Sequence, residues 1–261
     1  MILDGNKIRD KRKELLKQKV LELSNTPKLA IIQIGDRPDS NSYIKRKIDF
    51  GEEIGVEVEL FKFEENFGQD NLINEIEKLN QDESVNGMIL QLPLPESYDA
   101  NLITSKISLE KDVDGLNPSS KFLSATARGI FTLLEEYEIN ISGQKALVIG
   151  QSDLVGKPVA KKFSELGATV DTADINTQNL HEKTLDADII VVAVGSPKLI
   201  KKDFVKEGQV IIDVGINFVD GKLCGDVDFN EVEPIVHAIS PVPGGVGPMT
   251  VLSLFENLIS N

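Results

Sequence analysis

The sequence has few of the side chains on which metal binding and disulfide formation depend. Among its 261 residues there are one cysteine, Cys224, and two histidines, His181 and His237. A single cysteine cannot form a disulfide within the chain, and three scattered residues do not make a dedicated transition-metal site. We therefore expect no metal and a location in the reducing cytoplasm. With so little histidine, we expect any proton transfer to use lysine, tyrosine or a carboxylate.

Long apolar runs and an excess of positive charge are also missing. No apolar run approaches the roughly 20 residues that cross a bilayer, and residues 1–6 lack the basic region and apolar core of a signal peptide. The formal net charge of −14 argues against nucleic-acid binding and against docking on an anionic membrane. We therefore expect neither partner. An anionic small molecule is not excluded, because local charge can oppose the net field.

Proline and glycine are concentrated in residues 241–250, Pro-Val-Pro-Gly-Gly-Val-Gly-Pro-Met-Thr, which hold three of each. Proline removes backbone donors and fixes φ, whereas glycine permits φ values closed to other residues. A rigid apolar loop of this kind is typical of a binding site, and its last residues can open a helix. We take Pro243, Gly244 and Gly245 as candidate substrate-loop residues. A tight connector between domains is the alternative.

The apolar residues alternate between helix-like and strand-like segments. They predict helices at residues 6–23, 40–54, 69–80, 129–137, 155–167 and 249–260. They predict strands at residues 29–34, 56–62, 87–91, 146–150, 168–173, 189–194 and 210–214. Strands that alternate with helices form parallel sheets covered by helices. We therefore expect two three-layer α/β domains with mostly parallel sheets, separated by a cleft. The first would comprise residues 1–125 and 240–261, and the second residues 126–239.

A glycine-bounded turn follows the strand expected at residues 146–150. Gly150 ends this strand, Gln151 and Ser152 follow, and the next helix begins near Val155. A helix N-terminus offers unpaired N–H groups and a positive dipole end, which suit a pyrophosphate. The spacing is not G-x-G-x-x-G, so an ordinary strand-to-helix turn is the alternative. Because the turn lies in a βαβ unit, we favour nucleotide binding.

The residue after the next expected strand is an aspartate, Asp174. An acidic side chain at this position can accept hydrogen bonds from an adenosine ribose. It would repel a 2′-phosphate, and neither Ile175 nor Gln151 can pair with one. We therefore predict NAD rather than NADP as the cofactor. A solvated loop aspartate without a ligand is the alternative.

The first half of the chain holds polar candidates for chemistry. Tyr43 and Lys47 lie four residues apart on an expected helix, so they project from one face. A lysine becomes a base only where desolvation or nearby cations lower its pKa, and solvated surface lysines are commoner. Gln91 ends an expected buried strand at the edge where open α/β sheets bind ligands. Asp114 lies in the segment 111–115, Lys-Asp-Val-Asp-Gly, which is typical of a turn but can also bind a cation or a polar heterocycle.

Together these segments resemble the methylenetetrahydrofolate dehydrogenase/methenyltetrahydrofolate cyclohydrolase family. The resemblance runs in order along nearly the whole chain. Its segments are Tyr43 with Lys47, Gln91–Pro95, Lys111–Gly115, Gly150–Pro158, Val192–Gly195, Ile212–Asn217, Gly225–Val227 and Pro241–Thr250. Each segment alone is weak, whereas the ordered set is specific.

The resemblance implies a folate-binding N-terminal domain and a Rossmann-like domain for NAD(P), with NADP as the family default. It implies oxidation of 5,10-methylenetetrahydrofolate and hydrolysis of the product to 10-formyltetrahydrofolate. In such an enzyme Tyr43 stacks on the folate, Lys47 is the main catalytic group, Gln91 tunes that lysine and Asp114 holds the pterin. The cofactor contacts fall at Gly150, Gln151, Ser152, Ile175 and Ile216, to which we add Asp174 and Gly195. Family members are usually homodimers.

The chain departs from the family pattern at residues 124–127, Ser-Ala-Thr-Ala, where the family commonly has Pro-Cys-Thr-Pro. We expect a looser hinge there and unchanged chemistry. The cofactor loop also lacks the arginine or serine that NADP users present to the 2′-phosphate. One alternative is a monofunctional NAD-dependent dehydrogenase, which need not keep the amine of Lys47. Another is a non-catalytic dinucleotide-binding regulator, which need not keep Tyr43, Gln91 or Asp114 and which the fold alone does not exclude.

Overall fold

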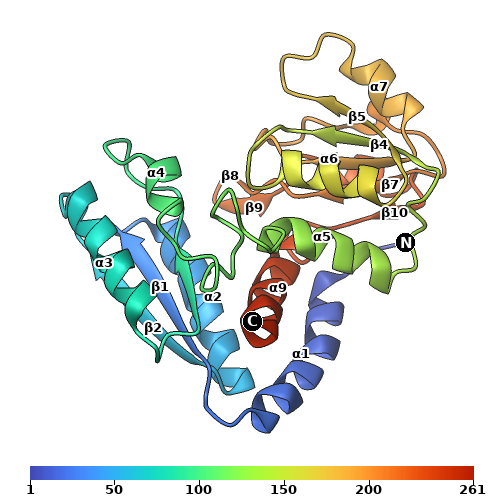
Figure 1. Cartoon of the computed structure of the whole chain (residues 1–261). Coiled ribbons are helices and arrows are strands. Elements are labelled where there is room, and N and C mark those ends of the chain that lie inside the picture. Colours follow the sequence, from blue (N-terminus) through green and yellow to red (C-terminus); the bar gives the residue numbers. More distant parts are fainter. The chain divides into compact units, whose positions relative to one another are not determined.

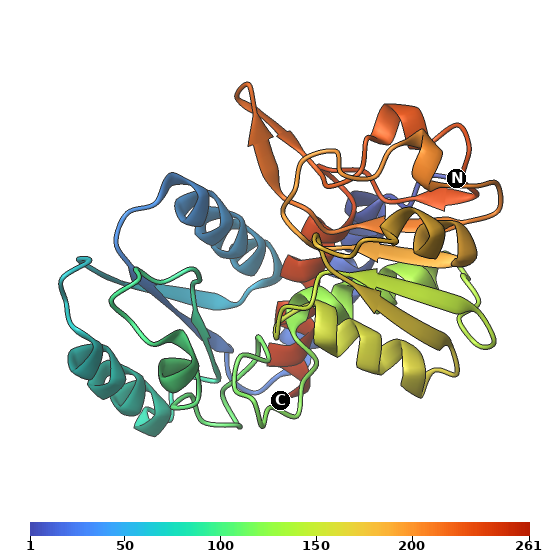
Figure 2. The same ribbon diagram turned by 90° about the horizontal axis from the view of Figure 1, so that it is seen from above.

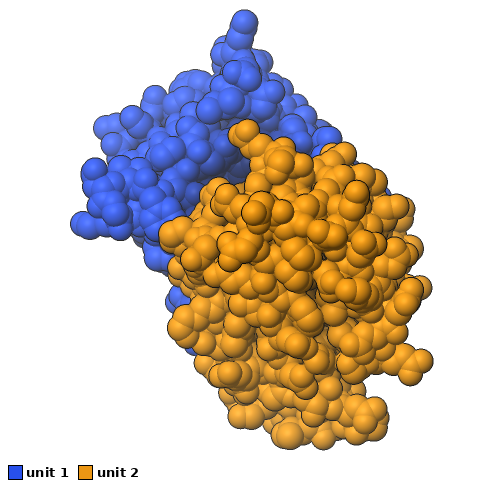
Figure 3. Space-filling model, turned by 90° about the vertical axis from the view of Figure 1, so that its left-hand side faces the viewer, with its two compact units in different colours: residues 1–10, 126–250 blue, residues 11–125, 251–261 orange.

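A computed structural model describes all residues of the chain, 1–261. The chain divides into two compact units (Figure 1), whose surfaces Figure 3 shows in blue and orange. Unit 1 comprises residues 1–10 and 126–250, and unit 2 comprises residues 11–125 and 251–261. None of the helices combines the length and the apolar character that a membrane span requires.

Unit 2 is built on a parallel three-stranded sheet with the order β2-β1-β3. Its strands and inserted helices are β1 (Lys28–Ile34), α2 (Pro38–Ile54), β2 (Glu57–Phe63), α3 (Gln69–Gln81), β3 (Gly87–Leu90) and α4 (Ala100–Thr104). The chain moves from β1 to β2 and then back past β1 to β3. Right-handed crossovers therefore place α2 and α3 on opposite faces of the sheet, as Figure 2 shows.

The last part of helix α9 (Val246–Ser260) belongs to unit 2. The ring of Phe255 packs on that of Phe50 in α2, with centroids 5.2 Å apart. Asn257 Nδ2 donates to Val113 O at 2.8 Å. Helix α9 therefore anchors both α2 and the segment that follows β3.

Unit 1 contains a parallel five-stranded sheet with the order β10-β7-β6-β4-β5. Its strands are β4 (Lys145–Ile149), β5 (Thr169–Ala173), β6 (Ile189–Val192), β7 (Val210–Asp213) and β10 (Ala238–Ile239). Its helices are α5 (Ala125–Glu136), α6 (Gly156–Glu165), α7 (Leu180–Asp186), η1 (Lys202–Phe204) and α8 (Phe229–Val232), and a hairpin pairs β8 (Asn217–Val219) with β9 (Lys222–Cys224). Numbered along the chain, the sheet has the doubly wound order 2-1-3-4-5, which reverses between β4 and β6. The α/β fold with parallel sheets is confirmed.

Two segments that we expected in the first domain lie in unit 1, the chain start and the loop before α9. Leu3 N donates to Ile239 O at 2.9 Å, which extends the sheet beside β10. Gly5 N donates to Gly244 O at 2.8 Å. These backbone bonds connect residues 1–10 to residues 239–244 of the same unit. The chain passes from one unit to the other after residues 10, 125 and 250.

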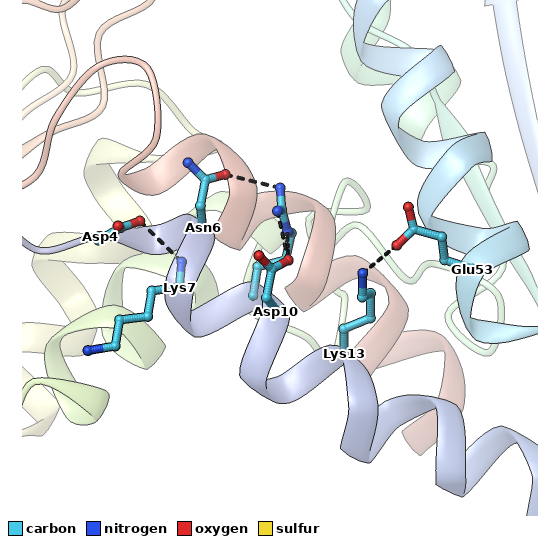
Figure 4. Close-up of polar contacts among 7 residues, drawn as sticks. Asp4, Asn6, Lys7, Asp10, Lys13 and Glu53 are labelled. Atoms are coloured by element: carbon cyan, nitrogen blue, oxygen red, sulfur yellow. Dashed lines mark hydrogen bonds and ion pairs between the residues drawn. The ribbon is translucent and has the colours of Figure 1, made fainter.

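Helix α1 (Gly5–Glu22) begins with a side-chain cap (Figure 4). Asp4 Oδ1 accepts the N–H of Lys7 at 3.1 Å, which satisfies one of the free donors of the first turn. Within unit 2, Lys13 Nζ pairs with Glu53 of α2 at 2.5 Å. Exposed pairs of this kind contribute little to stability, so the helix depends mainly on its buried apolar side chains.

Candidate functional site

Lys47 is the buried amine of unit 2. It lies on α2 with 8% of its surface exposed, and its Nζ donates to Gln91 Oε1 at 3.1 Å. Gln91 directly follows β3, and its Nε2 donates to Leu92 O at 2.8 Å. That second bond turns the amide oxygen toward the lysine. The structure therefore excludes a solvated surface lysine at this position.

The charge of Lys47 is coupled to that of Asp114. Burial lowers the pKa of the Lys47 amine, and the negative charge of Asp114 partly opposes this effect. Burial raises the pKa of Asp114 to about 6, while the charge of Lys47 acts against this rise and that of Asp112 adds to it. Removal from water favours the neutral form of each group. Both groups therefore exchange protons nearer to neutral pH than they would in water, as acid–base catalysis requires.

The loop that carries Asp114 is fixed by the buried side chain of Asp112. Asp112 is completely buried, and its carboxylate accepts the N–H groups of Leu116 and Asn117, both at 2.9 Å. Gly115 has φ +67°, and a Cβ there would lie 2.8 Å from facing backbone. Only glycine fits such a position. The position of Asp114 is thus determined by the residues around it.

Tyr43 lies one turn before Lys47 on α2 and is half-buried. The guanidinium carbon of Arg46 lies 5.6 Å from the centroid of the tyrosine ring. Burial raises the pKa of the Tyr43 phenol, so the ring is neutral at ordinary pH. A neutral aromatic ring at a partly open position can stack on a flat heterocycle.

Gly150 lies at the point of unit 1 where the strand order reverses. A Cβ on Gly150 would lie 2.2 Å from Ala193 O, in the segment after β6, and one on Gly156 would lie 1.9 Å from Gly150 O. The backbones after β4 and β6 therefore touch, and α6 starts against the turn. Only glycine permits these approaches. Open α/β sheets bind ligands at this reversal point, so the arrangement fits a dinucleotide.

Side chains hold the turn between β4 and α6. Gln151 Nε2 donates to Gly150 O at 2.7 Å. Ser152 Oγ accepts the N–H groups of Val155 at 3.2 Å and Gly156 at 3.4 Å. The serine thus holds the turn that leads into α6. The positive end of the helix dipole suits a bound phosphate.

Asp174 follows β5, the neighbour of β4 in the sheet. Its Oδ1 accepts the N–H of Asn176 at 2.8 Å and the hydroxyl of Thr177 at 3.2 Å. Its Oδ2 has no hydrogen bond within the chain, and the residue is exposed. The carboxylate is therefore held in place with one oxygen available to a ligand hydroxyl. Ile175, which follows, is 56% exposed.

The remaining predicted cofactor residues follow β6 and β7. Gly195 lies three residues after β6 with φ +68°, and Ile216 lies three residues after β7 with 44% of its surface exposed. Candidate residues thus follow the carboxyl ends of four adjacent strands, β5, β4, β6 and β7. In an open parallel sheet these ends share one edge.

The loop before α9 supports the start of the chain. Gly244 has φ +110°, and its carbonyl accepts the N–H groups of Gly5 and Asn6 at 2.8 Å and 3.2 Å. Gly245 N donates to Pro241 O at 2.8 Å. Helix α9 begins at Val246, so the helix opens inside the glycine- and proline-rich segment, as the sequence suggested.

The sequence matches two family models that together span most of the chain. Residues 3–114 match the catalytic domain of tetrahydrofolate dehydrogenase/cyclohydrolase, and residues 124–261 match the NAD(P)-binding domain of the same enzyme. The chain belongs to the tetrahydrofolate dehydrogenase/cyclohydrolase family. The resemblance drawn from the ordered motifs is confirmed.

Known proteins of this family match the chain over nearly their whole length. The "Bifunctional protein FolD" of Bacillus cereus is 43% identical over 274 residues, covering 100% of this chain and 96% of the relative. The crystal structure of the bifunctional FolD dehydrogenase/cyclohydrolase from Campylobacter jejuni has a TM-score of 0.97 at 42% identity, covering 100% of this chain and 97% of that one. The Trypanosoma brucei enzyme, solved with NADP and an inhibitor, has a TM-score of 0.95 at 30% identity, with 100% and 96% covered.

The predicted site residues fall into two groups, one in each unit. Tyr43, Lys47, Gln91 and Asp114 lie in unit 2, where the last three form one coupled set. The predicted cofactor residues and the loop 243–245 lie in unit 1. The structure also reveals polar residues to which the sequence assigned no role, above all the buried aspartates Asp213 and Asp226. A single aspartate at the end of the apolar strand Val-Ile-Ile-Asp was the available signal for Asp213.

Proposed function

We propose that the chain oxidises 5,10-methylenetetrahydrofolate to 5,10-methenyltetrahydrofolate with NAD(P), and hydrolyses the product to 10-formyltetrahydrofolate. Family membership over the whole chain supports both steps. The observation that carries the proposal is the buried Lys47 amine, held by Gln91 and coupled to Asp114. A buried amine beside a partly buried carboxylate is costly, so it indicates function more than stability.

The dehydrogenase step removes a hydride from the methylene carbon, and a folate nitrogen supplies the electron pair that stabilises the resulting cation. NAD(P)⁺, when bound, accepts the hydride. This step needs orientation more than proton transfer. We assign the orientation of the pterin to stacking on Tyr43 and to hydrogen bonding with Asp114. In unit 1 we assign the dinucleotide to Gly150, Gln151, Ser152, Gly195 and Ile216.

The cyclohydrolase step adds water to the methenyl carbon and then opens the ring by cleaving one carbon–nitrogen bond. The water must lose a proton as it attacks, and the leaving nitrogen must gain one. We assign this transfer to Lys47, whose lowered pKa makes the neutral amine accessible. Gln91 keeps the amine in place through the 3.1 Å bond to its Oε1.

For the dinucleotide we propose NAD over NADP. The support is Asp174, an exposed carboxylate with one oxygen free of internal hydrogen bonds, followed by the exposed apolar Ile175. A free carboxylate oxygen accepts ribose hydroxyls and repels a 2′-phosphate. Steady-state kinetics with both dinucleotides tests this assignment. A kcat/KM higher for NADP than for NAD would contradict it.

One experiment tests both activities. Pure protein is mixed with methylenetetrahydrofolate and each dinucleotide in turn, while the methenyl and reduced-nicotinamide absorbances are followed. A bifunctional enzyme gives reduced cofactor and only transient methenyl product. Reduced cofactor with lasting methenyl product indicates a monofunctional dehydrogenase, and no reduced cofactor with either dinucleotide refutes the proposal. We also propose a cytoplasmic homodimer, which light scattering of the purified protein tests for its oligomeric state.

A further inference from the structure

Two carboxylates in unit 1 are buried without a cationic partner. Asp226 is completely buried and Asp213 is 3% exposed. Every hydrogen bond that their carboxylate oxygens accept comes from a backbone N–H or a side-chain amide. A buried charge is costly unless strong hydrogen bonds compensate it. The segments that carry these donors are therefore the segments whose conformation depends on the two aspartates.

Asp226 holds the segment after β6. Its Oδ2 accepts the N–H of Val194 at 2.8 Å and the N–H of Gly195 at 3.0 Å. Its Oδ1 accepts the side-chain amide of Asn217 at 2.9 Å. These are the only hydrogen bonds that the N–H groups of Val194 and Gly195 make, so the course of this loop depends on Asp226.

Asp213 holds the segment after β7 and also Asp226 itself. Its Oδ1 accepts the N–H of Gly215 at 3.0 Å and the N–H of Asp226 at 2.9 Å. Its Oδ2 accepts the N–H of Val227 at 3.0 Å. Burial raises the pKa of Asp213 to about 7, against the effect of these three donors. The two aspartates thus connect the end of β7 to the loop after β6 through a chain of hydrogen bonds.

Two glycines lie so close to the carboxylates that a side chain at either position would overlap them. A Cβ on Gly215 would lie 2.3 Å from Asp226 Cγ, and one on Gly225 would lie 1.8 Å from Asp213 Oδ2. Both distances are far shorter than van der Waals contact. The backbone therefore packs directly on the two aspartates, and a shift of either carboxylate would move the loops.

We propose that Asp213 and Asp226 are positioning residues for the dinucleotide, holding the loops of Gly195 and Ile216 in the conformation that binds it. The inference rests on the proposed function, which assigns both loops to the cofactor. Neither aspartate needs to touch the ligand. Both act through backbone N–H groups whose positions they determine.

The donors predict different effects for two substitutions of Asp226. In D226N, the oxygen of the new side-chain amide can still accept the N–H groups of Val194 and Gly195, and Asn217 can rotate its own amide to accept the new NH₂ group. In D226L, all three donors lose their acceptor. We expect the dissociation constant for NADH to rise about tenfold or more in D226L and less than about threefold in D226N.

The test measures NADH and NADPH binding by nicotinamide fluorescence on the full chain. It also measures cyclohydrolase activity with preformed methenyltetrahydrofolate, without dinucleotide, together with the melting temperature. In D226L, the KM for the methenyl substrate should stay within about twofold of the wild type. D112N is the matched control, because Asp112 is an equally buried acceptor of backbone N–H groups in unit 2. It should leave NADH binding unchanged and raise the folate KM.

The inference is overturned if D226L binds NADH as the wild type does, or if its folate KM rises in parallel with its NADH dissociation constant. Should D226L fail to fold, D213N decides, because an amide cannot accept all three N–H groups that Asp213 accepts, and NADH binding must weaken there as well. A wild-type protein that binds neither dinucleotide refutes the proposed function. Normal wild-type binding with unaffected variants refutes only this inference.

Discussion

Replacing Asp114 with asparagine removes a charge that the folded protein disfavours. Burial raises the pKa of this carboxyl from 3.8 to about 6. Each pH unit of such a difference corresponds to about 1.4 kcal/mol. Ionised Asp114 therefore lowers the free energy of unfolding by on the order of 3 kcal/mol above pH 6. Asparagine has a similar shape and no charge, so D114N should be more stable than the wild type at pH 8 by up to that amount.

The gain should depend on pH in a defined direction. Below pH 3.8 the carboxyl is neutral in the folded and the unfolded chain, so it causes no loss of stability. Between pH 3.8 and about 6 the unfolded chain has released this proton and the folded chain still holds it, so stability falls as the pH rises and levels off above about 6. The advantage of D114N should therefore shrink from about 3 kcal/mol at pH 8 to less than about 1 kcal/mol at pH 4.

Urea unfolding at the two pH values, followed by circular dichroism, measures this difference. E96Q is a suitable control, because Glu96 is exposed and makes no hydrogen bond or ion pair, so its loss of charge should change little. A D114N variant no more stable than the wild type at pH 8 would show that Asp114 is not destabilised by burial. Both activities of D114N should fall, because Asp114 is assigned to the pterin. Higher stability with lower activity is the usual result of neutralising a buried functional charge.

Three further predictions concern the site. K47M should abolish cyclohydrolase activity, because methionine fills the buried space without an amine, and NADH binding should be unchanged by fluorescence; continued ring opening would remove Lys47 from the mechanism. Q91E places a carboxylate beside Lys47 and should raise the pKa of the amine, which moves the rise of cyclohydrolase activity to higher pH in a pH–rate profile; a profile that does not move would mean that Gln91 does not tune the lysine. D174A should lower kcat/KM for NAD and raise the NADP-to-NAD ratio by about tenfold, since it removes a ribose acceptor and a repulsive charge. An unchanged ratio in D174A would assign cofactor choice to other residues.

The sequence was sufficient for the strands and helices with strong periodicity. The strand expected at residues 29–34 is β1, Lys28–Ile34, and the helix expected at 69–80 is α3, Gln69–Gln81. The hairpin of β8 and β9 was missed, although its turn carries Asp220-Gly221, a strong hairpin signal. Both turn residues have positive φ, 51° and 73°. The flanking strands are only three residues long and show no alternation of polar and apolar residues, so periodicity could not find them.

The burial of Lys47 also had a signal in the sequence. The buried positions of α2 include Ile44, Lys47, Gly51 and Ile54, a spacing that defines one helical stripe. A lysine inside an apolar stripe is rarely solvated. Its partner could not be found in this way, because Gln91 lies 44 residues further along the chain and reaches Lys47 only through the pairing of β3 with β1. Asp213 and Asp226 were missed for the same reason, since most of their donors come from separate strands and loops.

Strand β2 forms an outer edge of the sheet in unit 2, and its composition bears on aggregation (Figure 1). An unpaired strand edge invites a second chain to add a strand. Glu57 and Glu59 on β2 are both exposed, and each forms an ion pair with Lys28 of the adjacent strand β1. Two like charges repel an identical edge that approaches in register. The charges on β2 therefore oppose the pairing of this edge with the same edge of a second chain.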